Sequence, residues 1–304
     1  MSCQFVAHLL LTLAGIGVEV FLFLIVGGIL RLWFFRETGR LQFGDGLEGK
    51  GCQALALGLV ALDGDKLLSV NLFRPAEGIG ATSMLDTYIS QEKFSGTGLT
   101  YLYIREREKP EKHWDNIIEH EINLSATEDR SEKTSELEGG YNLYWGRYRQ
   151  WRLFDDRLKL QAGGLVNGTI GFIYHTSTSN NPAQARLALN LMPSGVATYH
   201  FPLWKQHFSL CYELNLPLVG VMFSPNYGQS YYEIFSLGNY DHNVVPTTFI
   251  STPTFRQLLT LEWRTGKKWN IRIGYLGNYQ QAAVNNLKQH VYTHRLLLGI
   301  SRSL

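Results

Sequence analysis

The sequence has little cysteine, little charge and few long apolar runs, and each shortage excludes a class of protein. Three cysteines, Cys3, Cys52 and Cys211, are too few to predict a disulfide framework. Charged residues make up 18% of the 304 residues and the net charge is +2. Because there is no basic surplus, we expect no nucleic-acid partner. The apolar runs of roughly 20 residues that a bundle of membrane helices needs do not recur along the chain.

Glycine and aromatic residues are abundant instead. The chain has 30 Gly, 16 Tyr, 16 Phe and 7 Trp. This composition suits closely packed strands whose aromatic side chains lie at a membrane–water interface. Hydrophobic residues make up 45% of the chain, yet its mean hydropathy is −0.11. The apolar residues are therefore interspersed with polar ones.

The N-terminal segment has the composition of a targeting sequence. From Phe5 to Phe35 it is nearly all apolar, and its arginines follow the apolar stretch rather than precede it. We predict that residues 1–80 are an export segment of the signal-peptide type and a linker, since a barrel must leave the cytoplasm. A single inner-membrane helix and a buried helix of a soluble domain are the alternatives.

From about Ala81 onward the chain alternates between apolar and polar residues. Glu119 and Glu121 share one face of a predicted strand, and Leu124 lies on the other. The chain closes with Leu296, Leu298 and Ile300 on one face, typical of the C-terminal strand of outer-membrane barrels. We predict an all-β fold, an antiparallel up-and-down transmembrane β-barrel over residues 81–304, located in the bacterial outer membrane. A soluble periplasmic β-sandwich is the alternative.

The predicted barrel has ten strands, with its C-terminus in the periplasm. We expect a bulge at Pro193–Gly195, a tight turn at Thr265–Lys267 that sets Trp263 opposite Trp269, and an outer loop over residues 280–289. The count becomes twelve if Pro193–Gly195 is a turn or if Tyr231–Ser236 pairs as a strand. The strands are predicted over residues 81–90, 96–106, 113–126, 133–147, 157–175, 184–201, 207–222, 254–264, 269–279 and 290–303.

Val219–Pro253 is the least strand-like segment and the predicted functional loop. Loops of this length are commonly functional. Tyr227, Tyr231 and Tyr232 have rings suited to stacking on a sugar or lining a pore, although packing against the barrel wall explains them equally well.

Charged residues on the polar strand faces are expected to pair across the lumen. Glu262 and Arg272 lie diagonally across the last hairpin, and such pairs favour a plugged lumen over an open pore. The candidate ligand-binding or lumen residues are Tyr227, Tyr231, Tyr232, Glu233, Asp241, Arg256, Glu262 and Arg272.

No catalytic or metal site is predicted. Ser230 and His242, with Glu233 or Asp241, are weak candidates for a hydrolytic triad, but no GxSxG motif accompanies them. His290 and His294 lie four residues apart on a strand, about 13 Å, too far to share one ion. We therefore expect no metal and no cofactor.

Several segments resemble a family of uncharacterised Bacteroidetes proteins, a domain of unknown function thought to form exported barrels. They run from Leu85–Ser90 to the closing strand, and the most specific is Phe223–Phe235, FSPNYGQSYYEIF. The similarity covers roughly residues 80–304. It implies a Gram-negative envelope and an outer-membrane location, and it assigns no functional residues.

We therefore predict a non-enzymatic outer-membrane barrel that binds a ligand, passes small solutes or scaffolds the envelope. A lipid- or lipopolysaccharide-modifying hydrolase is the alternative. The expected partners are the lipid bilayer, lipopolysaccharide and the assembly machinery that inserts barrels.

Overall fold

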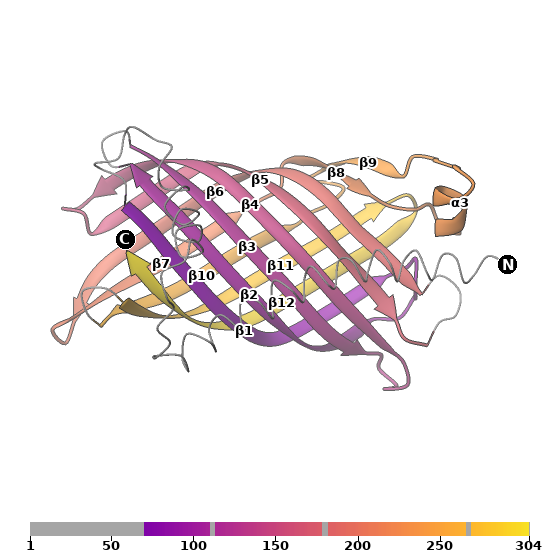
Figure 1. Ribbon diagram of the computed structural model, residues 1–304, viewed down its shortest axis with the longest axis horizontal. Helices are drawn as coiled ribbons and strands as arrows, with labels where there is room; N and C mark the ends of the chain where they lie inside the picture. The colour runs from indigo at the N-terminus through magenta and orange to yellow at the C-terminus, as the bar shows by residue number, and fades with distance from the viewer. Residues whose placement is uncertain (1–69, 110–112, 178–181, 266–268, 304) are drawn as a thin grey trace, which may run out of the picture. The chain divides into compact units, whose positions relative to one another are not determined.

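The structure is a computed structural model that describes residues 70–109, 113–177, 182–265 and 269–303 (Figure 1). Most of the export segment predicted over residues 1–80, that is residues 1–69, lies outside the described residues, as does Leu304. Within the described ranges, no helix is long and apolar enough to cross a membrane.

Ten antiparallel strands form a closed barrel in the order β5-β4-β3-β2-β1-β12-β11-β10-β7-β6, because β6 also pairs with β5. The predicted ten-stranded barrel is confirmed, and the β-sandwich alternative is excluded. The strands are β1 (Val70–Asp86), β2 (Phe94–Lys109), β3 (Trp114–Glu128), β4 (Ser135–Leu153), β5 (Leu158–His175), β6 (Ala183–Leu203), β7 (Gln206–Asn215), β10 (Phe255–Arg264), β11 (Trp269–Val284) and β12 (Leu287–Ser303).

The period-2 alternation places polar side chains in the lumen and apolar ones outside. Glu119 and Glu121 are buried, whereas Leu124 is exposed on the outer face of the same strand. Leu296, Leu298 and Ile300 of β12 also face outward. An apolar outer face is the surface that lipid covers, so this alternation is that of a transmembrane barrel. The predicted location in the outer membrane is confirmed by this architecture.

The two ends of the barrel differ. At the turn end, a two-residue turn at Trp204–Lys205 joins β6 to β7, and the last strand ends here (Figure 1). At the loop end, Asn285–Asn286 joins β11 to β12. All four turn residues have positive φ, as type I′ hairpins require. The outer loop predicted over 280–289 is therefore wrong, because strand residues occupy it up to this turn.

Strand register corrects three further expectations. Trp263 lies opposite Ile271, not Trp269, because the β10–β11 connection is longer than a tight turn. Pro193 causes no bulge, since β5 and β6 keep one register along their whole pairing. The register instead slips by one residue on the other side of β6, between its pairings with β7 and β8. β1 also begins at Val70, before the strand predicted over 81–90.

Aromatic side chains gather on the outer face at the turn end. Tyr199, Phe201, Phe208 and Trp263 form a stacked row across β6, β7 and β10, with ring centroids 5.9–6.4 Å apart. Across β1–β4, β11 and β12, arginines stack on aromatic rings instead, as Arg302 does on Trp269 at 5.1 Å. These side chains form the interfacial girdle of the barrel.

A hairpin and a short helix extend the wall at the loop end. β8 (Val219–Phe223) continues β7 and pairs with β6, and β9 (Val244–Thr248) pairs with β8. Between them lies α3 (Tyr231–Phe235), at the far end of the barrel from the turns (Figure 1). The Tyr231–Ser236 strand alternative is therefore wrong. The predicted loop Val219–Pro253 has this hairpin at its base.

Candidate functional site

An ion cluster around Arg256 crosses the middle of the lumen. Arg256 of β10 donates to Glu119 at 2.7 Å, to Glu121 at 2.8 Å and to Glu213 at 2.8 Å. Its guanidinium carbon also lies 4.6 Å from the centre of the Tyr144 ring. The three carboxylates come from β3 and β7, so one arginine joins strands on different sides of the barrel. All five side chains are buried.

A second ion cluster lies closer to the turn end. Lys159 of β5 contacts Glu106 at 2.7 Å, Glu108 at 2.5 Å and Asp115 at 3.3 Å. Arg74 of β1 contacts Glu106 at 2.9 Å. The Lys159 contacts join β5 to β2 and β3, whereas the Arg74–Glu106 pair joins the neighbouring strands β1 and β2.

Arg295 of β12 links a third group of strands through neutral partners. Its guanidinium donates to Thr100 at 3.0 Å, to Thr82 at 2.7 Å and to Ser125 at 3.1 Å. It also donates to the main-chain oxygen of Ala81 at 2.6 Å. The predicted plugging of the lumen by charged side chains thus matches these contacts, although most of the partners differ from those expected.

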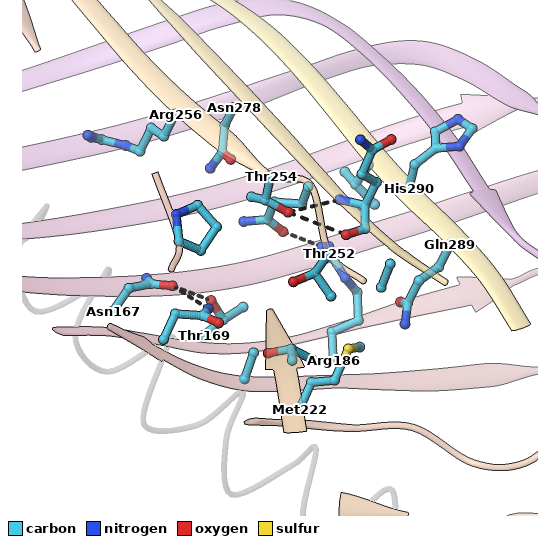
Figure 2. A pocket seen from close by; sticks show the side chains of 18 of the residues that line it. Asn167, Thr169, Arg186, Met222, Thr252, Thr254, Arg256, Asn278, Gln289 and His290 are labelled. Carbon is cyan, nitrogen blue, oxygen red and sulfur yellow. Dashed lines mark hydrogen bonds between the residues drawn. The ribbon is translucent and has the colours of Figure 1, made fainter. Parts of the chain in front are cut away.

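Between the Arg256 cluster and the loop end lies a cavity of about 90 Å³, which we call the chamber. In Figure 2, Arg256 and Asn278 lie on one side of it, Asn167 and Thr169 on another, and Thr252 and Thr254 between them. Carboxamides and hydroxyls dominate its polar lining: Asn167, Asn190, Asn278, Gln280, Gln281, Gln289, Thr169, Thr247, Thr252 and Thr254.

Arg186 is the second cation in the chamber wall, after Arg256. It contacts Glu138 at 3.3 Å and also donates to Gln280. Since both arginines are already paired with carboxylates, the chamber offers a free ligand mainly neutral donors and acceptors. A water needs at least about 10–15 Å³ of such space, so the chamber has room for several waters.

The loop above the chamber is folded around α3. Ser230 caps the helix: its hydroxyl accepts from the main-chain nitrogen of Glu233 at 3.2 Å, and the Glu233 carboxylate accepts from the nitrogen of Ser230 at 2.7 Å. These reciprocal hydrogen bonds form a capping box, and this local role accounts for both Ser230 and Glu233. Ile234 is the buried residue of the helix.

Tyrosines attach this loop to the barrel rim. The Tyr231 hydroxyl donates to Gln184 at 2.9 Å and accepts from the nitrogen of Ala185 at 2.7 Å, both on β6. Tyr88, in the turn after β1, donates to the main-chain oxygen of Gln229 at 2.9 Å. Burial, with Asp86 and Glu233 nearby, raises the pKa of Tyr88 to about 12. Tyr231 therefore has a packing role in this structure.

The other loop candidates are exposed. Tyr227 and Tyr232 have large exposed fractions. His242 contacts Asp241 at 2.6 Å, and both side chains point to solvent, at 89% and 72% exposure. Ser230 hydrogen-bonds to Glu233 rather than to this pair. The structure thus brings Ser230 and Glu233 together, and separately His242 and Asp241.

Glu262 and Arg272 lie directly opposite each other on β10 and β11, not diagonally as expected. Their side chains bind other groups. Glu262 accepts from Asn270 at 2.8 Å, and Arg272 donates to Thr260 at 3.2 Å. The expected pairing between Glu262 and Arg272 is replaced by these neutral contacts, although both side chains do belong to the lumen face.

Sequence reasoning missed most of the chamber. Tyr144 and Arg186, which line the chamber, each occupy a lumen position of an alternating strand, so the alternation could have found them. For Asn167 and Gln280, the sequence contains no indication of a binding site beyond the same alternation. In the described part of the chain, no group of three His, Cys, Asp or Glu residues could hold a metal ion.

Several solved structures are similar to this chain at low sequence identity. The translocator domain of autotransporter NalP from Neisseria meningitidis is 11% identical, with a TM-score of 0.36 over 84% of this chain and 94% of that one. The transport unit of autotransporter AIDA-I from Escherichia coli is 9% identical, with a TM-score of 0.40 over 84% and 97%.

A third structure, the COG4313 outer membrane channel from Pseudomonas putida F1, is 9% identical, with a TM-score of 0.34 over 80% of this chain and all of that one. These likenesses carry no functional information. No curated protein matches the chain. A family profile, described as a protein of unknown function (DUF3316), matches residues 73–304. The chain therefore belongs to the DUF3316 family, a family of unknown function, as the sequence predicted.

Proposed function

We propose that this protein is a closed, non-enzymatic outer-membrane barrel that binds a small hydroxyl-rich ligand, such as a neutral sugar, in the chamber. The observation that carries the proposal is the chamber lining. Carboxamides such as Asn167 and Asn190 can donate and accept, and threonine hydroxyls such as Thr169 can do both. Such groups match the hydroxyls of a sugar, and the cavity of about 90 Å³ takes a sugar only when part of its wall moves outward.

The lumen contacts argue against the other non-enzymatic roles that the sequence left open. Arg256 and Lys159 each hold several carboxylates across the lumen, so steady passage of solutes requires breaking buried ion pairs. A scaffold needs no polar chamber near its loop end. Binding therefore has the strongest support of the three.

The hydrolase alternative requires a base within hydrogen-bond reach of the Ser230 hydroxyl. That hydroxyl is engaged in the helix cap, and His242 is paired with Asp241. No specific observation favours hydrolysis. The Bacteroidetes origin, the signal peptide, the periplasmic C-terminus and contacts with lipopolysaccharide and the assembly machinery remain predictions from the sequence.

Calorimetric titration of the folded protein in phosphatidylcholine nanodiscs tests the proposal, because no glycoside detergent then competes. We expect maltose to bind and Asn190→Leu to weaken its binding at least tenfold. Gln150→Leu is the matched control, because Gln150 is a buried lumen carboxamide that does not line the chamber. Failure of maltose and glucose to bind the wild-type protein would refute the proposed ligand class.

A further inference from the structure

The barrel wall is interrupted beside the chamber. β10 pairs with β11 only as far as Phe255 opposite Tyr279, whereas β11 continues to Val284. Among the described pairings, β9 has β8 as its one partner strand. The six residues Phe249–Thr254, which we call the strap, connect β9 to β10 outside any strand. The strap is therefore the piece of wall that faces the end of β11.

Few contacts hold the strap against β11. The nitrogen of Ala283 donates to the main-chain oxygen of Ser251 at 3.0 Å. The other contacts use side chains: Gln281 donates to the oxygen of Pro253 at 2.6 Å, and the Thr254 hydroxyl accepts from the nitrogen of Gln281 at 3.2 Å and donates to its oxygen at 3.3 Å. The neighbouring β10–β11 pair has ten residue pairs in register. Moving the strap thus disrupts far less of the wall than separating two strands.

The strap has a polar inner side and an apolar outer side. Thr252 and Thr254 line the chamber, as Figure 2 shows. Phe249 and Ile250 are exposed, Ile250 at 90%. Leu187, an exposed residue of β6, also lines the cavity, so the chamber reaches toward the apolar outer face of the wall at this level.

We propose that the chamber takes the headgroup of an amphipathic ligand, a lipid with a neutral saccharide head, that enters from the bilayer beside the strap; this rests on the proposed function. The chamber itself is too small for a sugar unless its wall moves, and the strap is the weakly held wall. A headgroup that displaces the strap meets carboxamides inside. Its acyl chain stays in the bilayer against Phe249 and Ile250.

A reversible disulfide between the strap and β11 tests this route. Ser251→Cys with Ala283→Cys joins the two residues whose main chains are hydrogen-bonded. The protein, in phosphatidylcholine nanodiscs, is exposed to dodecyl maltoside with a photoreactive diazirine in its alkyl chain, and cross-links are mapped by mass spectrometry. We expect cross-links at Phe249, Ile250 or Leu187 in the reduced protein and at least a tenfold loss on oxidation, restored by dithiothreitol. Wild-type protein under both conditions controls for Cys211, the free cysteine of the described chain.

A second variant covers the case in which the double cysteine protein does not fold. Phe249→Ser with Ile250→Ser is expected to weaken dodecyl maltoside labelling at least fivefold and to leave maltose binding unchanged. Leu99→Ser, at an equally outward position on β2, is the matched control.

The outcomes separate the two proposals. Equal labelling of the oxidised and reduced proteins, or labelling unchanged by Phe249→Ser with Ile250→Ser, overturns the lateral route and leaves maltose binding in the chamber intact. If wild-type protein binds neither maltose nor dodecyl maltoside, the proposed function itself fails.

Discussion

Replacing Arg256 with methionine tests whether the lumen cluster holds the barrel together. The substitution keeps most of the side-chain volume but removes the cation that Glu119, Glu121 and Glu213 all contact. These carboxylates are almost fully buried, so water does not replace the lost contacts. The change leaves three negative charges close together without compensation.

The expected cost follows from the three contacts. A hydrogen bond to a charged group contributes about 1.5–3 kcal/mol, and three at the lower figure give about 4.5 kcal/mol. Removing one partner of a buried ion pair costs about 3–5 kcal/mol, which agrees. We therefore expect Arg256→Met to lower the free energy of unfolding by about 4 kcal/mol.

Urea-induced unfolding of the refolded protein in detergent micelles, followed by tryptophan fluorescence, measures this change. Arg264→Met is the control, because Arg264 is exposed and has one long contact, 3.4 Å to His200. It should cost less than about 1 kcal/mol. Adding Glu119→Gln, Glu121→Gln and Glu213→Gln to Arg256→Met should restore most of the lost stability. A loss below about 1 kcal/mol for Arg256→Met, or no recovery on neutralising the carboxylates, would contradict the reasoning.

Three further changes probe local features. Glu136 is buried, and among the described residues neither of its carboxylate oxygens has a hydrogen-bond partner, so Glu136→Met should be neutral or raise the urea midpoint; a marked loss of stability would contradict this. Ser230→Ala removes the cap of α3, should cost the loop about 1 kcal/mol, and should speed proteolysis within residues 224–243 while leaving barrel unfolding unchanged. Gly96→Ala would put its Cβ 2.1 Å from the main-chain oxygen of Ala126, whereas Gly195→Ala meets nothing within 4 Å. Heat-modifiability gels should therefore show a lower transition temperature for the first change and no loss for the second.

The sequence allowed the barrel and its faces to be predicted because a strand of this kind repeats every two residues. Glu119, Glu121 and Arg256 were placed in the lumen by that repeat alone, and the structure confirms their side. The repeat carries no information on which lumen residues meet. Arg256 and Glu119 are 137 residues apart, and only closure of the barrel and its register bring them together.

Turns and irregular segments were predicted less well. Asn285–Asn286 is a recognisable type I′ turn, yet its polar surroundings suggested a loop. The spacing of Ser230 and Glu233 matches a capping box, a signal for α3 that was available and not used. The slip of register beside Pro217 depends on how β7 and β8 follow β6, which no local pattern specifies.

The position of Arg256 has a consequence for how the barrel forms. Glu213 lies on β7, the neighbour of β10, but Glu119 and Glu121 lie on β3, which reaches Arg256 only when the sheet has curled into a complete ring. An open sheet gains nothing from the two contacts with β3 and leaves the Glu119 and Glu121 carboxylates in water. A ring with a wrong strand number or a shifted register buries the same charges without partners, at a cost of several kcal/mol. The cluster thus favours the closed barrel with the correct strand number and register, because only there does every buried charge have a partner.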